Sequence, residues 1–203
     1  MKVELIDKMG TDLSVVNAAR VSYAKEKEEF EESDERLIRY LAEHKHWSPF
    51  AHTFLSFRIK APVFVARQLV KHQVGLVWNE ESRRYITHDP EIYNIRKWRE
   101  KPDSSKQGSG EQILISTELN LEVNEHLQQG LSLYNRLLLE NVAPEQARAI
   151  LPQSMYTNWI WSGTLYAFAR VCELRLDEHS QKETQDIAPV SYTHLTLPTS
   201  YPV

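Results

Sequence analysis

The spacing of hydrophobic residues divides the chain into short strands and longer helices. Apolar side chains alternate with polar ones at Leu55, Phe57 and Ile59, which predicts a strand over residues 53–60 with one buried face. Farther along, apolar residues recur at every third or fourth position, which predicts a helix over residues 113–140 with one apolar stripe. The stripe comprises Leu119, Val123, Leu127, Leu131, Tyr134 and Leu138.

The same patterns place the remaining elements. Two more strands are predicted, at residues 3–6 and 155–161. Helices are predicted at residues 12–24, 34–43, 62–71, 144–150 and 165–174, with Ser33 capping the second and Ser162 or Thr164 capping the last. Residues 74–78 show no regular pattern, and residues 96–112, rich in Lys, Ser and Gly, indicate a loop.

Composition describes one ordinary globular domain. The 203 residues are 41% hydrophobic and 26% charged, with a formal net charge of −4, so any affinity for phosphate must come from a local basic patch. A single cysteine, Cys172, excludes an internal disulfide framework and a cysteine zinc cluster. The sequence shows neither a signal peptide nor an apolar run long enough for a membrane span, so we expect a cytoplasmic protein.

Residues 68–85, with the sequence QLVKHQVGLVWNEESRRY, concentrate the polar chemistry of the chain. Cations and a hydroxyl group follow a largely apolar approach at residues 54–70. Arg and Lys supply charge-assisted donors, so the pattern indicates a site for a phosphorylated substrate. The alternative is a basic helix end followed by a polar loop.

Four blocks in this sequence resemble the motifs of flavin-dependent thymidylate synthases. Residues 79–85 match the pattern N-E-x-S-x-R-Y, and Lys71-His72-Gln73 stand where that family has R-H-R, with a spacer one residue longer than the common form. The other blocks follow in the family's order: EHKHWSPFAH at residues 43–52, RAILPQSMYT at 148–157 and LRLDEHSQKE at 174–183. The resemblance covers most of residues 1–188.

The resemblance implies a fold, a reaction and an assembly. The fold would be α/β, with a central mixed sheet flanked by helices, and the chain would form a homotetramer whose active sites are shared between subunits. The reaction would methylate dUMP to dTMP, with methylenetetrahydrofolate as one-carbon donor and FAD reduced by NADPH as hydride source. The partners would be small molecules, with neither nucleic acid nor membrane among them.

Motif positions also imply the site residues. Arg175 would be catalytic, because a guanidinium beside the uracil stabilises the negative charge that forms when N3 loses its proton. The dUMP set would be Gln68, Lys71, Glu80, Glu81, Ser82, Arg83, Arg84, Arg148 and Arg175. The FAD set would be His46, Ser48, Lys71, His72, Gln73, Glu80, Thr164, Tyr166, Arg170 and His179. Gln73 cannot replace the charge of an arginine.

Several alternatives stand beside these roles. Without the resemblance, Arg175 would be a helix-end cation paired with Asp177 or Glu173. Cys172 could be the nucleophile of a different thymidylate synthase chemistry, but a position late in a helix and beside Glu173 favours an inert core thiol. No metal is expected, because the spacing of His44, His46, His52 and His72 fits no familiar ligand set.

A second class of function is a nucleotide- or RNA-binding module. The basic cluster from Lys71 to Arg84 would contact phosphates and Trp78 would stack on a base, with steeply salt-dependent binding of oligonucleotides. The end of the chain raises a third alternative, a protein that folds without activity. Residues 189–203 resemble translated vector sequence, which suggests a domain at residues 1–188 whose natural C-terminal part is missing.

Overall fold

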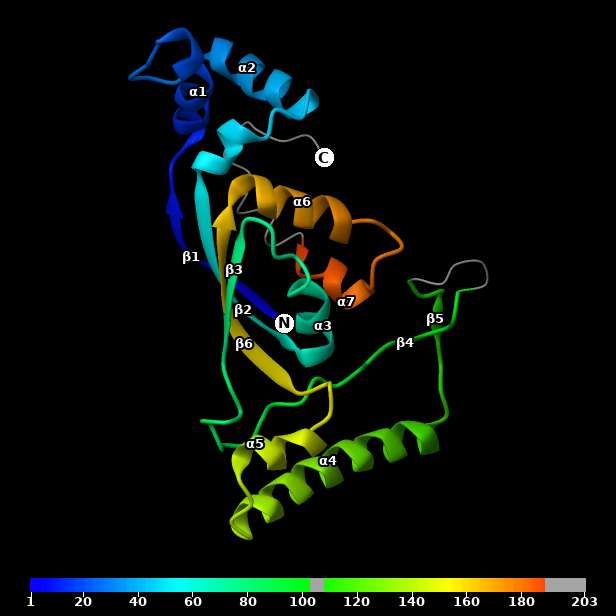
Figure 1. The fold of residues 1–203 in the computed structure, drawn as a ribbon. Coiled ribbons are helices and arrows are strands. Elements are labelled where there is room, and N and C mark those ends of the chain that lie inside the picture. The colour runs from blue at the N-terminus through cyan, green and yellow to red at the C-terminus, as the bar shows by residue number, and fades with distance from the viewer. Residues whose placement is uncertain (103–107, 189–203) are drawn as a thin grey trace.

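The computed structural model describes residues 1–102 and 108–188, and its centre is a four-stranded sheet (Figure 1). The strands are β1 (Lys2–Met9), β2 (Phe54–Pro62), β6 (Tyr156–Thr164) and β3 (Leu76–Glu80), in that order across the sheet. Every neighbouring pair is antiparallel, so the α/β class is confirmed but the predicted mixed sheet is wrong. The reason lies in the connections. The chain leaves β1 at Met9 and returns at Phe54, which pairs with Met9, so β2 must run back along β1.

One face of the sheet carries the core. Leu55, Phe57 and Ile59 are buried as predicted, together with Trp159 and Trp161 on β6. Helices α3 (Val63–Leu69), α6 (Leu165–Arg175) and α7 (Lys182–Gln185) lie on the same side of the sheet (Figure 1). The opposite face is open, since Phe54, Val77 and Ile160 are between 40% and 65% exposed.

Helices also cap the two ends of the sheet. At one end lie α1 (Asp12–Arg20), α2 (Glu32–Glu43) and a 3₁₀ helix at Ser48–His52, and at the other lie α4 (Thr117–Leu139) and α5 (Pro144–Ala147) (Figure 1). The first helix is shorter than predicted, because Val21–Tyr23 tighten into a 3₁₀ turn and Ala24 takes a left-handed φ of 52°. The second begins one residue before Ser33, with Glu31 and not Ser33 at its N-cap.

Three segments differ from the predictions. Residues 76–80, within and just beyond the stretch read as irregular, form β3, where the Trp78 ring stacks on Trp159 with centroids 4.4 Å apart. The expected loop at residues 96–112 contributes a small ribbon of β4 (Trp98–Arg99) and β5 (Gln112–Ile113). Helix α4 therefore begins at Thr117, capped by Ser116. The predicted non-native tail at residues 189–203 lies outside the described residues.

Candidate active site

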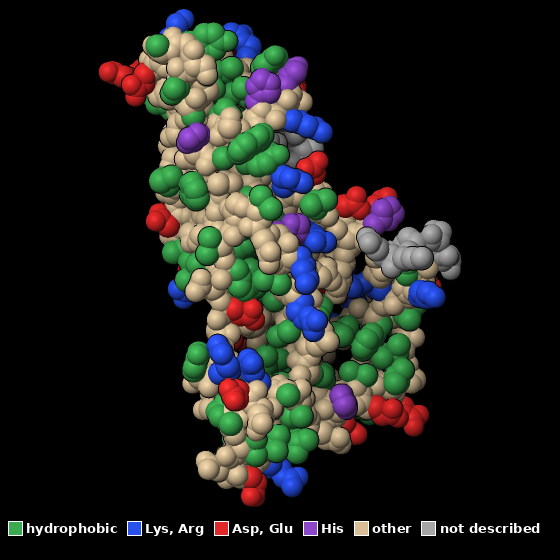
Figure 2. Space-filling view, in the orientation of Figure 1, with side chains coloured by type: hydrophobic (Ala, Val, Ile, Leu, Met, Phe, Trp, Pro, Cys, Tyr) green, Lys and Arg blue, Asp and Glu red, His purple; other side chains and the backbone are tan. Residues whose placement is uncertain are grey.

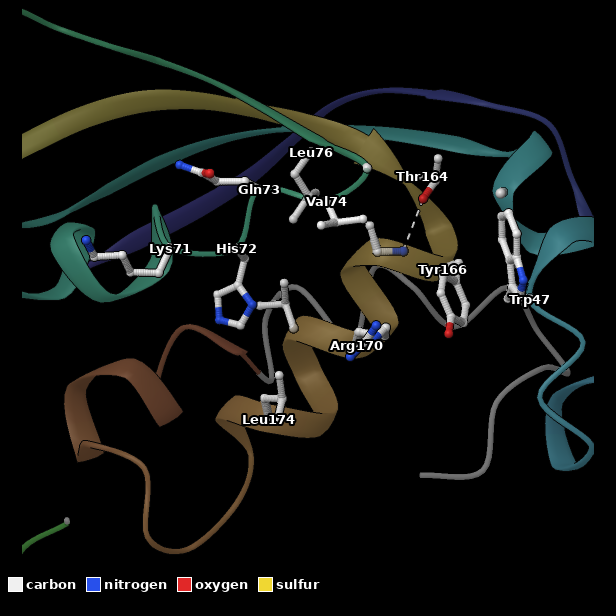
Figure 3. Close-up of a pocket in the computed structure, with 14 residues that line it drawn as sticks. Trp47, Lys71, His72, Gln73, Val74, Leu76, Thr164, Tyr166, Arg170 and Leu174 are labelled. Carbon is white, nitrogen blue, oxygen red and sulfur yellow. Dashed lines mark hydrogen bonds between the residues drawn. The ribbon is translucent and has the colours of Figure 1, made fainter. Parts of the chain in front are cut away.

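A cavity of about 500 Å³ opens between the segment after α3 and the length of α6 (Figure 3). Lys71, His72 and Gln73 lie on one side of it, and Trp47 and Tyr166 lie on the other (Figure 3). The complete lining is Trp47, Ala51, Lys71, His72, Gln73, Val74, Gly75, Leu76, Thr164, Tyr166, Ala167, Arg170, Val171 and Leu174.

Two glycines allow this wall to form. Gly75 has a φ of +76°, which turns the chain from the 71–74 segment into β3. Its carbonyl oxygen accepts a hydrogen bond from the amide of Thr164 at 3.1 Å, and the Thr164 hydroxyl caps α6 by accepting from the amide of Ala167 at 3.1 Å. A Cβ atom on Gly163 would lie 2.2 Å from the Gly75 oxygen, so only glycine fits there.

The cavity combines positive charge with aromatic rings. Lys71 and Arg170 are exposed at its edge. The Trp47 and Tyr166 rings lie 5.9 Å apart between centroids. Figure 2 shows Lys and Arg side chains down the middle of this face, over α6 and the end of α3. Cations suit a diphosphate and aromatic side chains suit a flat ring, so these residues fit FAD chemically.

Arg175 does not itself line the cavity but contacts His72, which does. The Nε of Arg175 donates to Nε2 of His72 at 2.9 Å, and both side chains are half-buried. Burial lowers the pKa of His72 below its ordinary value, and the nearby guanidinium groups of Arg175 and Arg170 lower that pKa further. His72 is therefore neutral at pH 7.

Most of the predicted FAD set gathers at this cavity. Its members there are Lys71, His72, Gln73, Thr164, Tyr166 and Arg170. The other predicted members lie elsewhere in the single chain. His46 packs edge-on against Tyr40 with ring centroids 6.0 Å apart. Ser48 begins the 3₁₀ helix directly after Trp47. His179 is exposed, with its Nε2 3.6 Å from Oε1 of Glu178. Glu80 lies at the far end of β3.

Much of the predicted dUMP set lies at that far end. The Arg84 side chain is exposed, and its Nε donates to the Ser82 hydroxyl at 3.2 Å. Arg148 is also exposed and donates to the carbonyl of Glu145 at 3.3 Å. Ser82 lies seven residues after Gly75, which at the rise of a strand is roughly 20 Å along the chain. One chain therefore separates the predicted phosphate contacts from the cavity.

The remaining members of the dUMP set already have partners within the chain. Arg83 is 6% exposed and donates to the carbonyl oxygen of His88. Glu80 accepts from the Thr157 hydroxyl at 2.7 Å. Glu81 accepts from the Asn158 amide at 2.8 Å.

Gln68 is held on α3 by residues of α7 and the segment before it. Its side-chain nitrogen donates to Gln181, and its oxygen accepts from the Thr184 hydroxyl at 3.2 Å. Gln181 in turn donates to Glu183 at 2.9 Å, and Glu183 pairs with Arg99 at 2.6 Å. The LRLDEHSQKE block thus has a structural role that its sequence did not reveal.

Cys172 lies in the core, as its position in the sequence predicted. It is 1% exposed, and burial raises the pKa of its thiol to about 12. The sequence places Glu173 beside this thiol, but burial and not that carboxylate raises the pKa. Cys172 is therefore not poised as a nucleophile.

Motif matching missed several cavity residues: Trp47, Ala51, Val74, Gly75, Leu76, Ala167, Val171 and Leu174. Trp47 stands inside the EHKHWSPFAH block and Gly75 inside the variable spacer, so an aromatic residue and a glycine within these motifs were the available signals. Among the described residues, no three His, Cys, Asp or Glu side chains are grouped to hold a metal ion. In the same part of the chain, no helix is long and apolar enough to cross a membrane.

The fold is that of an α/β protein, and its cavity combines cations with aromatic side chains. Comparison with known proteins makes this specific: the chain belongs to the family described as thymidylate synthase complementing protein, whose sequence profile matches residues 4–196. The motif resemblance found in the sequence is thereby confirmed at the level of the family.

Relatives named flavin-dependent thymidylate synthase are similar along most of their length. The protein from Kosmotoga olearia is 40% identical over 190 residues, covering 92% of this chain and 81% of the relative. A relative from Thermus thermophilus is 38% identical over 186 residues, covering 92% and 68%. A crystal structure of the UMP/dUMP methylase PolB from Streptomyces cacaoi, bound with 5-Br dUMP, superposes with a TM-score of 0.82. It is 31% identical and covers 95% of this chain and 88% of that one.

Proposed function

We propose that this protein is a flavin-dependent thymidylate synthase, which methylates dUMP to dTMP with methylenetetrahydrofolate and with FAD reduced by NADPH. The observation that carries this is the cavity, where six of the residues that the family resemblance implies for FAD line one space. They come from sequence positions about 90 residues apart, Lys71 to Gln73 and Thr164 to Arg170. The buried Cys172 agrees with a reaction that uses no cysteine nucleophile.

The residues of the cavity would hold FAD by charge and stacking. Lys71 and Arg170 would pair with its diphosphate, and Trp47 and Tyr166 would pack against its flat parts. When bound and reduced by NADPH, FAD would supply the hydride that completes the methyl group. The uncharged Gln73 lies at the same wall, so the cations Lys71 and Arg170 would supply the charge in its place.

The substrate would meet two groups of side chains. Arg175 would lie at the uracil edge, where its charge stabilises the N3 anion and makes C5 more nucleophilic. Ser82, Arg84 and Arg148 would bind the phosphate dianion through charge-assisted hydrogen bonds.

The separation of these two groups supports a shared site in a homotetramer. Arg84 lies beyond the far end of β3, away from Arg175 and the cavity, so one subunit would supply the phosphate contacts and another Arg175. Unpartnered apolar surface supports assembly as well. Of the residues in α4 only Tyr134 is buried, and Leu119 of the predicted stripe is 47% exposed. The open face of the sheet adds Phe54, Val77 and Ile160.

A spectrum and an assay test this function. The purified protein should carry, or take up, FAD with absorbance near ~450 nm. It should then convert dUMP to dTMP only when methylenetetrahydrofolate and NADPH are both present. UMP belongs in the same assay, because the structural neighbour is named a UMP/dUMP methylase. A protein that binds FAD but methylates neither nucleotide would refute the proposed reaction.

A further inference from the structure

The hydrogen bond between Arg175 and His72 fixes which form of the histidine can take part. Arg175 is always a donor, and its Nε–H points at Nε2 of His72 across 2.9 Å. Nε2 must therefore offer a lone pair, which places the histidine proton on Nδ1. A protonated His72 would present an N–H to another N–H and a positive charge to a guanidinium.

The surroundings of His72 favour this neutral form. The side chain is half-buried at the cavity wall, between the end of α3 and α6. The charged groups that act on it from α6 are Arg175 and Arg170, and Lys71 precedes it on its own segment. All three are cations, so each of them opposes a second positive charge on the imidazole.

The hydrogen bond to His72 also orients the guanidinium group of Arg175 toward a ligand. Arg175 is the last residue of α6, and its long side chain has many rotamers there. The bond to His72 uses Nε, so both terminal nitrogens keep their donors for the edge of a planar ligand. A guanidinium held at Nε offers a pre-oriented pair of N–H groups in place of a mobile one.

We propose that His72 is a positioning residue for the methylation step, which acts through Arg175: its neutral imidazole accepts from Arg175 Nε and aims the guanidinium at the uracil. The proposal rests on the proposed function and adds to it, because it gives His72 a role toward the substrate besides its place in the flavin cavity. It also makes methylation depend on the deprotonated state of one histidine.

Two variants of His72 distinguish the role of the hydrogen-bond acceptor from that of the flat ring. His72→Gln keeps an acceptor oxygen at about the reach of Nε2 but does not titrate, whereas His72→Phe keeps a flat ring without an acceptor. His126→Gln, an exposed histidine on α4, is the matched control. Each protein is loaded with FAD, and three quantities are measured from about pH 5.5 to 8, a range that brackets histidine titration: flavin content, flavin reduction by NADPH, and dTMP formation.

We expect the wild type and the control to lose dTMP formation as the pH falls through the lowered pKa of His72. His72→Gln should stay within about threefold of wild type at pH 8 and lose that acid limb. Per bound flavin, His72→Phe should form dTMP about 10- to 100-fold more slowly at every pH, as expected for a misplaced catalytic group. The rate is referred to flavin content because His72 also lines the FAD cavity.

Two results would overturn the proposal. Equal dTMP formation per bound flavin by His72→Gln and His72→Phe would show that no acceptor is needed. A defect of His72→Phe that disappears when the rate is referred to bound flavin would make His72 a flavin ligand only. A protein that binds FAD and forms no dTMP in its wild-type form refutes the proposed function instead. In that case ¹⁵N NMR of His72 still tests the contact, which requires the Nδ1–H tautomer near pH 7 in the wild type. A protonated Nε2 there would contradict the hydrogen bond.

Discussion

Replacing Cys172 by alanine should leave methylation intact. The thiol lies in the core beneath α6, 1% exposed, and its Sγ donates to the carbonyl of Ala188 at 3.8 Å. With a pKa of about 12, roughly one thiol in 10,000 is ionised at pH 8. Such a group supplies almost no thiolate, and no path for dUMP reaches it without opening the core.

Cys172→Ala should lower the free energy of unfolding and leave the rate of dTMP formation unchanged. Losing one buried sulfur from a packed site costs about 1 kcal/mol, which in a domain of this size lowers Tm by about 2–4 °C. Cys172→Ser is the matched variant, since it keeps the volume but buries a hydroxyl and should cost more. Thermal unfolding and dTMP formation at 25 °C, with flavin content as the reference, measure both effects.

A cysteine nucleophile would give the opposite result. Cys172→Ala would then form dTMP at least about 1,000-fold more slowly at unchanged flavin content and little changed Tm. That outcome would refute both the burial argument and the direct hydride chemistry drawn from it.

Three further substitutions test the fold and the site. Gly163→Ala should destabilise the protein by about 1–3 kcal/mol and weaken FAD binding, because the new Cβ meets the Gly75 oxygen at 2.2 Å; unchanged FAD titration and Tm would contradict this close approach. Arg84→Gln should raise KM for dUMP about tenfold or more with little effect on flavin reduction, measured by steady-state kinetics, whereas an unaltered KM would remove Arg84 from the phosphate site. Burial raises the pKa of Asp34, but hydrogen bonds from Lys27, the Glu31 amide and Arg20 outweigh it and hold that pKa below its usual value. Asp34→Asn should therefore cost about 1–3 kcal/mol by urea unfolding at pH 7, and the difference should vanish as the pH falls through the lowered pKa; a constant difference would exclude the charge as its cause.

Local sequence patterns predicted the elements whose buried face or cap is encoded within the element itself. The alternation of Leu55, Phe57 and Ile59 gave β2 its buried face, and Thr164 caps α6 as expected from its hydroxyl. The family resemblance also implied Lys71, His72 and Gln73 together with Thr164, Tyr166 and Arg170 as FAD contacts, and the fold brings these six residues to one cavity. A family resemblance can name such residues because it carries their chemistry directly, without needing the path of the chain.

Features made by distant partners could not be predicted in this way. Residues 76–80 form a strand because β6 supplies the hydrogen bonds and Trp159 supplies a stacking surface for Trp78. Strand direction in the sheet depends on which ends the connections join, which hydrophobic spacing does not encode. Gly163 becomes essential only when the Gly75 carbonyl lies against it.

The separation of Arg84 from Arg175 within one chain has a genetic consequence. If each site draws these residues from different subunits, two defective alleles, one encoding Arg84→Gln and the other Arg175→Ala, can correct each other when expressed together. In randomly mixed tetramers about one site in four would combine an intact Arg84 with an intact Arg175, and thymidine auxotrophy would be relieved. Either allele alone would leave the cell dependent on thymidine, so a growth plate can report on the quaternary structure.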